Sequence, residues 1–148
     1  MLDVLMVTPP SRLEVYQDLS GDFAAIEPPV WSSLIAKYLL ERNYTVKILD
    51  AEAELLNHKQ TAEKIVKENP KLIVYMIYGQ QPSASTQCMP AGAKTAKIVN
   101  DLTDQSIKSV VIGTHASALS KRTLEEEPYD FVCQGEGPLT IEGLIDHI

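Results

Sequence analysis

The chain has 148 residues, of which 45% are hydrophobic, and its formal net charge is −7 at pH 7. This size predicts a single domain, and an acidic chain lacks the basic patch that nucleic-acid binding requires. No apolar run approaches the roughly 20 residues of a membrane span, and the first residues follow a strand pattern rather than that of a signal peptide. We therefore expect neither a nucleic-acid nor a membrane partner, and a cytoplasmic location.

Apolar runs alternate with segments of helical periodicity along the chain. Strands are predicted at residues 2–7, 44–49, 72–78, 110–112 and 131–133. Helices are predicted at residues 30–42, 60–68, 85–102 and 119–126, and from residue 138 onward. Because proline is tolerated only near the start of a helix, Pro90 and Gly92 are expected in or before the first turn of the third helix.

The alternation of strands and helices predicts βαβ units and a parallel sheet. Right-handed crossovers leave few topologies. We predict a three-layer α/β fold of the flavodoxin-like (Rossmann-like), doubly wound type, with a five-stranded parallel sheet in the order 2-1-3-4-5. Residues 9–27 form one long connection at the switch point of this topology, and loops of that length are usually functional.

Two glycine-containing loops follow the last two predicted strands. Residues 113–117 follow the fourth strand, and residues 134–137 follow the fifth. Both loops leave the carboxyl edge of the sheet, where open α/β folds bind ligands. Glycine has no Cβ and lets a backbone approach a ligand closely. The two loops indicate a bulky ligand that lies over the sheet edge.

Polar residues near the other strand ends are further candidates. Arg12 and Tyr16, in the long first connection, either lie beneath the ligand or belong to a solvated loop. The third strand is followed by side chains that fit either polar ligand arms or an ordinary polar loop at a helix start: Gln80, Gln81, Ser83, Ser85 and Thr86.

Several ligand classes lack their sequence signatures. The turn after the first strand, residues 8–12, contains no glycine, which argues against a dinucleotide-binding unit, and there is no Walker-A loop. A phospho-acceptor receiver domain needs an aspartate after the third strand, where this chain has Tyr78, Gly79 and Gln80.

The histidines and cysteines form no catalytic or metal-binding set. His58 and His147 are expected to be exposed and without a role. His115 is expected either to hydrogen-bond to a neighbouring backbone group or to contact the ligand, since a single imidazole binds metal weakly. Cys133 is expected in the core, and Cys88 in a polar loop or at a helix start, so neither a disulfide nor a zinc site is predicted.

These segments together resemble the N-terminal B12-binding domain of cobalamin-dependent radical SAM proteins. That family has a proline-rich turn after strand 1, a G-G-x-H-A-T turn after strand 4 and a G-E-G-E turn after strand 5. The chain differs in having Thr114 at the second glycine of the strand-4 turn and Pro138 at the last acidic residue of the strand-5 turn. The resemblance covers nearly the whole chain and is carried by residues 4–11, 27–31, 44–51, 111–116 and 130–137.

The resemblance implies that residues 1–148 are a cobalamin-binding domain of a longer radical SAM protein. It implies cobalamin bound base-off, with the benzimidazole detached from cobalt, because the D-x-H-x-x-G motif that supplies a cobalt-ligating histidine elsewhere is missing. No residue is assigned to direct metal ligation. The residues assigned to the cofactor are Thr8, Pro9, Pro10, Ser11, Arg12, Tyr78, Gly79, Gln80, Ser83, Ser85, Thr86, Gly113, Thr114, His115, Ala116, Ser117, Gln134, Gly135, Glu136 and Gly137.

The resemblance also implies the activity of the parent protein. The domain would hold methylcobalamin for methyl transfer, and a radical SAM domain outside this sequence would carry S-adenosylmethionine and an iron–sulfur cluster. The chain alone is then not expected to catalyse a reaction. The alternative is a flavodoxin-like module of the same sheet order that binds flavin, a nucleotide or a partner protein.

Overall fold

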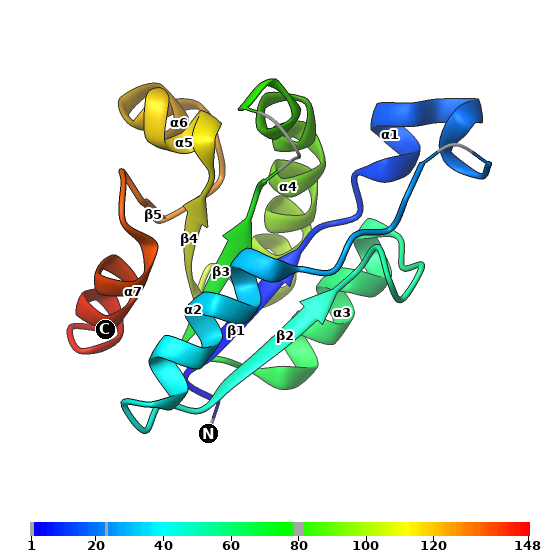
Figure 1. Cartoon of the computed structure of the whole chain (residues 1–148). Helices are drawn as coiled ribbons and strands as arrows, with labels where there is room; N and C mark the ends of the chain where they lie inside the picture. The colour runs from blue at the N-terminus through cyan, green and yellow to red at the C-terminus, as the bar shows by residue number, and fades with distance from the viewer. Residues whose placement is uncertain (1, 23, 79–81) are drawn as a thin grey trace.

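The computed structural model describes residues 2–22, 24–78 and 82–148. Its centre is a five-stranded, all-parallel sheet in the order β2-β1-β3-β4-β5, which confirms the predicted topology (Figure 1). The strands are β1 (Val4–Thr8), β2 (Val46–Asp50), β3 (Leu72–Met76), β4 (Lys108–Ile112) and β5 (Phe131–Val132).

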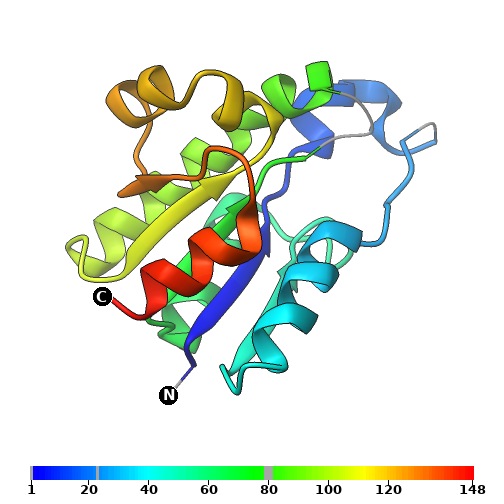
Figure 2. The ribbon, with the colours of Figure 1, turned by 60° about the vertical axis from the view of Figure 1, so that its left-hand side comes forward.

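Helices cover both faces of the sheet, as Figures 1 and 2 show, and complete the predicted three-layer, flavodoxin-like arrangement. On one face lie α2 (Val30–Leu40) and α7 (Gly137–Ile145), and on the other lie α3 (His58–Glu68) and α4 (Pro82–Thr103). The connection from β4 to β5 contains α5 (Thr114–Ala118) and α6 (Ser120–Glu126). No helix in the described ranges is long and apolar enough to cross a membrane.

The central strands are buried on both faces, which explains why they read as continuous apolar runs. In β3, Leu72 and Val74 belong to the core cluster shared with α2 and α7, whereas Ile73 and Tyr75 belong to the cluster shared with α3 and α4. All four side chains are at most 1% exposed. The sheet is therefore held between two apolar cores, one on each of its faces.

Strand register brings the carboxyl ends together at one edge. Thr8 pairs with Asp50, Met76 pairs with Ile112, and Val111 pairs with Val132. The segments that follow these strands therefore meet at that edge, the carboxyl edge of the sheet.

The long first connection is more ordered than the sequence indicated. It contains α1 (Arg12–Tyr16) and a 3-10 helix, η1 (Gln17–Ser20), next to the carboxyl edge. Most of the loop expected at residues 113–117 instead belongs to the short helix α5. Neither was predicted, because α1 has no buried residue and α5 has only Ala116, so neither shows apolar periodicity.

The expectation for Pro90 and Gly92 was wrong, because α4 begins at Pro82 and both residues lie well inside it. Proline has no N–H to donate to the carbonyl of Thr86 one turn earlier. Both Pro90 and Thr86 are exposed, so water can satisfy that carbonyl. Core packing of Met89, Ala96 and Val99 offsets the remaining cost.

Candidate functional site

The residues predicted to bind a cofactor lie in segments that meet at the carboxyl edge. Residues 8–12 follow β1, Tyr78 lies just beyond β3, residues 113–117 follow β4, and residues 134–137 follow β5. Gly79 and Gln80 fall outside the described residues, as does the side chain of Ser83.

A cavity of about 680 Å³ opens at this edge, at the carboxyl ends of β1 and β3. Its volume lies within the range of small-molecule sites, roughly 300–1,000 Å³. Of the residues that the sequence pointed to, Thr8, Ser11, Arg12, Tyr16 and Tyr78 line it. Among the described residues, those that follow β4 and β5 lie outside it, so they form a separate, neighbouring part of the edge.

The cavity has a polar and an apolar side. Its polar lining includes Asp50, the last residue of β2, and Glu52, just after it, neither of which was assigned to the cofactor from the sequence. Its apolar lining comes from the start of α2 and the residues before it, including Ile26, Val30 and Trp31. Such a mixed surface suits a large ligand with both apolar faces and polar arms.

Glu52 fixes the segment that borders the cavity on the β1 side. Its Oε1 accepts hydrogen bonds from the backbone N–H of Ser11, from the Ser11 hydroxyl (3.1 Å) and from the backbone N–H of Arg12 (2.6 Å). Its Oε2 lies 3.7 Å from Arg12 Nε, and Arg12 Nη1 donates to the carbonyl of Ser20 (2.6 Å). The carboxylate therefore caps α1, and Arg12 ties the start of α1 to the end of η1.

Glu14 attaches the same segment to the α3–α4 face. Its Oε1 lies 2.8 Å from Lys94 Nζ and 2.9 Å from His58 Nε2. Burial raises the pKa of Glu14, but the hydrogen bonds from Lys94 and His58 outweigh that effect and hold the pKa below its ordinary value. The expectation that His58 is exposed and without a role was wrong, because its side chain is only 14% exposed and is also hydrogen-bonded to Thr95 (2.9 Å).

Gly113 is required by close packing within the protein. A Cβ at this position would lie 2.1 Å from the carbonyl oxygen of Ile77. The buried hydroxyl of Ser85 donates to that same carbonyl (2.6 Å) and accepts from the backbone N–H of His115 (3.2 Å). Ser85 is fully buried and joins β3, α4 and α5, so its position gives it a structural role.

Two side-chain contacts shape the edge beyond β4 and β5. His115 Nδ1 is hydrogen-bonded to the Thr86 hydroxyl (2.9 Å), so its partner is a side chain and not the neighbouring backbone group that was one of its two expected uses. The Ser117 hydroxyl accepts from the backbone N–H of Gly135 (2.9 Å) and so joins the two predicted loops. Gly135 has a φ of +88°, and a Cβ there would meet no atom within 4 Å, so space above this loop is open.

The thiols near the edge are not ready metal ligands. Burial raises the pKa of Cys88, which lines the cavity, and that of Cys133, which lies in the core as expected. A thiol must lose its proton to ligate metal, and these shifts oppose that loss. The part of the chain that the structure describes contains no cluster of three or more side chains suited to a metal ion.

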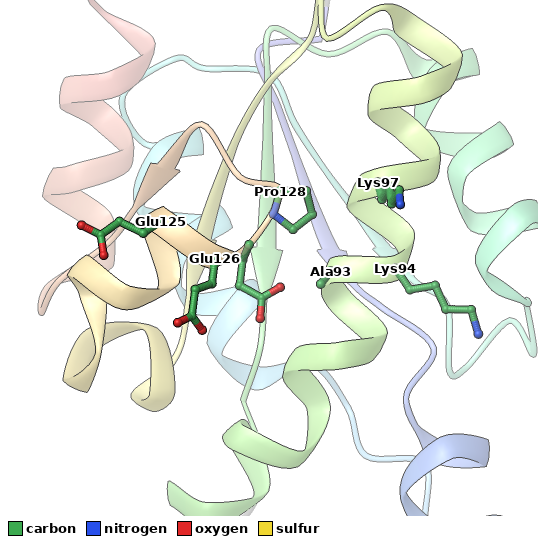
Figure 3. Close-up of a pocket in the computed structure, with 7 residues that line it drawn as sticks. Ala93, Lys94, Lys97, Glu125, Glu126 and Pro128 are labelled. Atoms are coloured by element: carbon green, nitrogen blue, oxygen red, sulfur yellow. The ribbon is translucent and has the colours of Figure 1, made fainter.

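A second hollow, of about 540 Å³, lies between the middle of α4 and the end of α6 (Figure 3). Lys94 and Lys97 lie on one side, and Glu125, Glu126 and Glu127 lie on the other. Lys94 is already paired with Glu14. None of the residues predicted to bind a cofactor lines this hollow, so the cavity at β1 and β3 is the better candidate site.

Comparison with protein families decides what kind of domain this is. A family model described as the B12 binding domain matches residues 16–145. The chain belongs to the B12-binding domain family. The match begins at residue 16 and so does not include the turn at residues 8–12. The only support for a role of this turn in ligand binding is that three of its residues, Thr8, Ser11 and Arg12, line the cavity. A search of curated proteins gave no match.

Solved structures share the fold of this B12-binding domain. The radical S-adenosylmethionine methyltransferase TsrM from Kitasatospora setae, with tryptophan substrate and a SAM analog bound, aligns with a TM-score of 0.77 at 16% identity, over 100% of this chain and 26% of TsrM. A TsrM structure with cobalamin and a [4Fe-4S] cluster gives 0.73 at 16% identity, over 99% of this chain and 24% of that chain. The chemotaxis protein CheY4 from Vibrio cholerae gives 0.61 at 13% identity, over 100% and 98%. The chain thus spans about a quarter of TsrM.

Proposed function

We propose that this B12-binding domain holds cobalamin at the carboxyl edge, with the corrin ring against the part of the cavity bordered by Arg12 and Val30. The observation that carries the proposal is the position of the cavity at the carboxyl ends of β1 and β3. In the order β2-β1-β3-β4-β5, that is the switch point at which doubly wound sheets bind ligands.

The lining of the cavity fits this cofactor. The corrin ring carries methyl groups and amide arms, so it needs both apolar contacts and hydrogen-bond partners. Ile26 and Val30 supply the apolar side. Arg12 lines the polar side, and a guanidinium is a suitable donor to the amide carbonyls of the cofactor.

We propose further that the cofactor is bound base-off, without a histidine below the cobalt. No histidine among the described residues lines the cavity. His58 is engaged by Glu14 and Thr95, and His115 by Thr86. The freed benzimidazole tail would then lie toward the loops that follow β4 and β5, where the space above Gly135 is open.

The parent protein is proposed to be a cobalamin-dependent radical SAM methyltransferase. This chain spans about a quarter of TsrM, whose fold it shares, which leaves room in such a protein for a radical SAM domain with S-adenosylmethionine and an iron–sulfur cluster. When bound, methylcobalamin would supply the methyl group for transfer. The role of this chain is to bind and orient that cofactor.

The alternative ligands, flavin and nucleotides, are disfavoured by the position of Glu52. A dinucleotide phosphate would bind at the N-terminus of the helix after β1, where backbone N–H groups are available. Here the N–H groups of Ser11 and Arg12 already donate to the Glu52 carboxylate, and Asp50 adds a second negative charge to the cavity. A phosphate would be repelled there.

A visible-absorbance titration tests the proposal. The purified chain is titrated with hydroxocobalamin and, in parallel, with flavin mononucleotide. We expect a saturable shift toward a base-off spectrum with hydroxocobalamin alone. Arg12→Gln should weaken that binding, whereas Arg122→Gln, which changes an exposed arginine on α6, should not. Absence of a shift at near-millimolar cobalamin, or binding of the flavin alone, would overturn the proposal.

A further inference from the structure

Trp31 and Tyr78 form a stacked aromatic pair at the rim of the cavity. Their ring centroids are 5.7 Å apart, and their planes differ by 24°. Both residues line the cavity, although Trp31 lies in the first turn of α2 and Tyr78 follows β3. Trp31 is the only tryptophan of the chain and was not among the residues assigned to the cofactor from the sequence.

The fold does not need an indole at this position. The buried face of α2 is formed by other residues, including Ile35 and Leu39, and Trp31 remains 57% exposed. Tyr78, by contrast, is half-buried and packs against the core cluster shared by α2 and α7. The exposed indole of Trp31 therefore rests on the half-buried ring of Tyr78. The free face of such an indole is suited to stacking with a flat aromatic ring of a ligand.

The pair also lies between the two parts of the carboxyl edge. Tyr78 lines the cavity on one side. Tyr78 follows β3, which lies between β1 and β4 in the sheet, and it packs against the core cluster that contains Cys133, just after β5. A group that extends from the cavity toward residues 134–137 therefore passes this pair.

Cobalamin has one flat aromatic group that fits this surface. The corrin ring is saturated at its periphery and carries methyl groups and amide arms, whereas the benzimidazole of the nucleotide tail is planar and aromatic. In the base-off state the benzimidazole leaves the cobalt and needs another environment. We propose that Trp31, supported by Tyr78, stacks on this base and determines the affinity for the nucleotide tail. The inference rests on the proposed function.

Cobinamide, which has the corrin but lacks the nucleotide tail, separates a contact to the base from a contact to the corrin. Hydroxocobalamin and aquacobinamide are each titrated, by visible absorbance, into the wild-type chain, Trp31→Ala, Trp31→Phe and Leu34→Ala. Leu34 is a matched control, because it lies one turn further along α2, is also 57% exposed and does not line the cavity. Thermal unfolding of each variant checks that it is folded.

We expect Trp31→Ala to weaken hydroxocobalamin binding about tenfold and to leave aquacobinamide binding within about twofold of wild type, as the loss of one base–aromatic stack predicts. Trp31→Phe should restore most of the affinity, and Leu34→Ala should change neither ligand. An equal loss for both ligands in Trp31→Ala, or no loss for either, overturns this inference while cobalamin binding stands. If the wild-type chain binds neither ligand, the proposed function itself fails.

Discussion

Glu52→Ala is expected to loosen residues 11–20 without unfolding the sheet. The Glu52 carboxylate accepts from the backbone N–H groups of Ser11 and Arg12 and from the Ser11 hydroxyl. Because α1 has no buried residue, apolar packing contributes little to holding it in place. Polar anchoring by Glu52, and by Glu14 at a second point, therefore controls how often this segment opens.

The size of the effect follows from the contacts that are lost. Removal of a side chain that caps a helix costs about 0.5–2 kcal/mol, and a hydrogen bond to a charged group contributes about 1.5–3 kcal/mol. Water replaces part of this interaction in the variant, so we expect the free energy of opening residues 11–20 to fall by about 2 kcal/mol. That change corresponds to a roughly 30-fold larger open population of the segment. The Glu52 side chain is 17% exposed, so the interaction is only partly screened by solvent.

Amide hydrogen exchange measured by mass spectrometry tests this prediction. Peptides that cover residues 11–20 should exchange about 30-fold faster in Glu52→Ala. Peptides from β3 should be unchanged, because that strand is fully buried. Glu54→Ala is the matched control, since it removes the same charge from the same turn but only breaks an ion pair with Lys64. Equal exchange in the two variants, or no change at residues 11–20, would refute the anchoring role of Glu52.

Three further outcomes are expected. Gly135→Val should lower the free energy of unfolding in urea by about 1–2 kcal/mol, because its φ is +88°. The free energy of cobalamin binding should be weakened by more than this amount. A loss of stability with unchanged affinity would show that the glycine is purely structural. His115→Ala should cost roughly 1–2 kcal/mol of cobalamin affinity without altering the coordination signature of the spectrum; disappearance of a histidine-type spectrum would instead reveal cobalt ligation. Chiefly through its hydrogen bond with Lys71, the pKa of Asp3 is lowered from 3.8 to about 2. The ionised Asp3 carboxylate therefore stabilises the folded state above about pH 4, and this stabilisation is lost as the pH falls toward 2. In Asp3→Asn the free energy of unfolding should depend less steeply on pH in this range than in wild type, which acid unfolding measures.

The sheet was predictable because its signal is local. Each residue of β3, Leu72–Met76, is buried, so the strand reads as an uninterrupted apolar run. Once five such runs alternate with helices, right-handed crossovers restrict the order of strands. The carboxyl edge then follows, which is why the segments after β1, β4 and β5 could be predicted to lie at one edge of the sheet.

The anchoring of the site was not predictable, because it depends on contacts between residues distant in sequence. Glu52 lies about 40 residues from Ser11 and Arg12, and His58 lies 44 residues from Glu14. No periodicity marks such pairs. Gly113 lies at the carboxyl edge as predicted, but the sequence suggested ligand approach as the reason for a glycine there, whereas the structure shows that a Cβ would collide with the carbonyl of Ile77.

A crystal structure of this chain with hydroxocobalamin tests the central proposal most directly. We predict corrin density at the carboxyl edge between Arg12 and Val30, with the benzimidazole displaced from cobalt past Trp31 toward residues 134–137 and no protein nitrogen on the metal. Corrin density in the hollow beside Lys97 and Glu127, or His115 bound to cobalt, would contradict it.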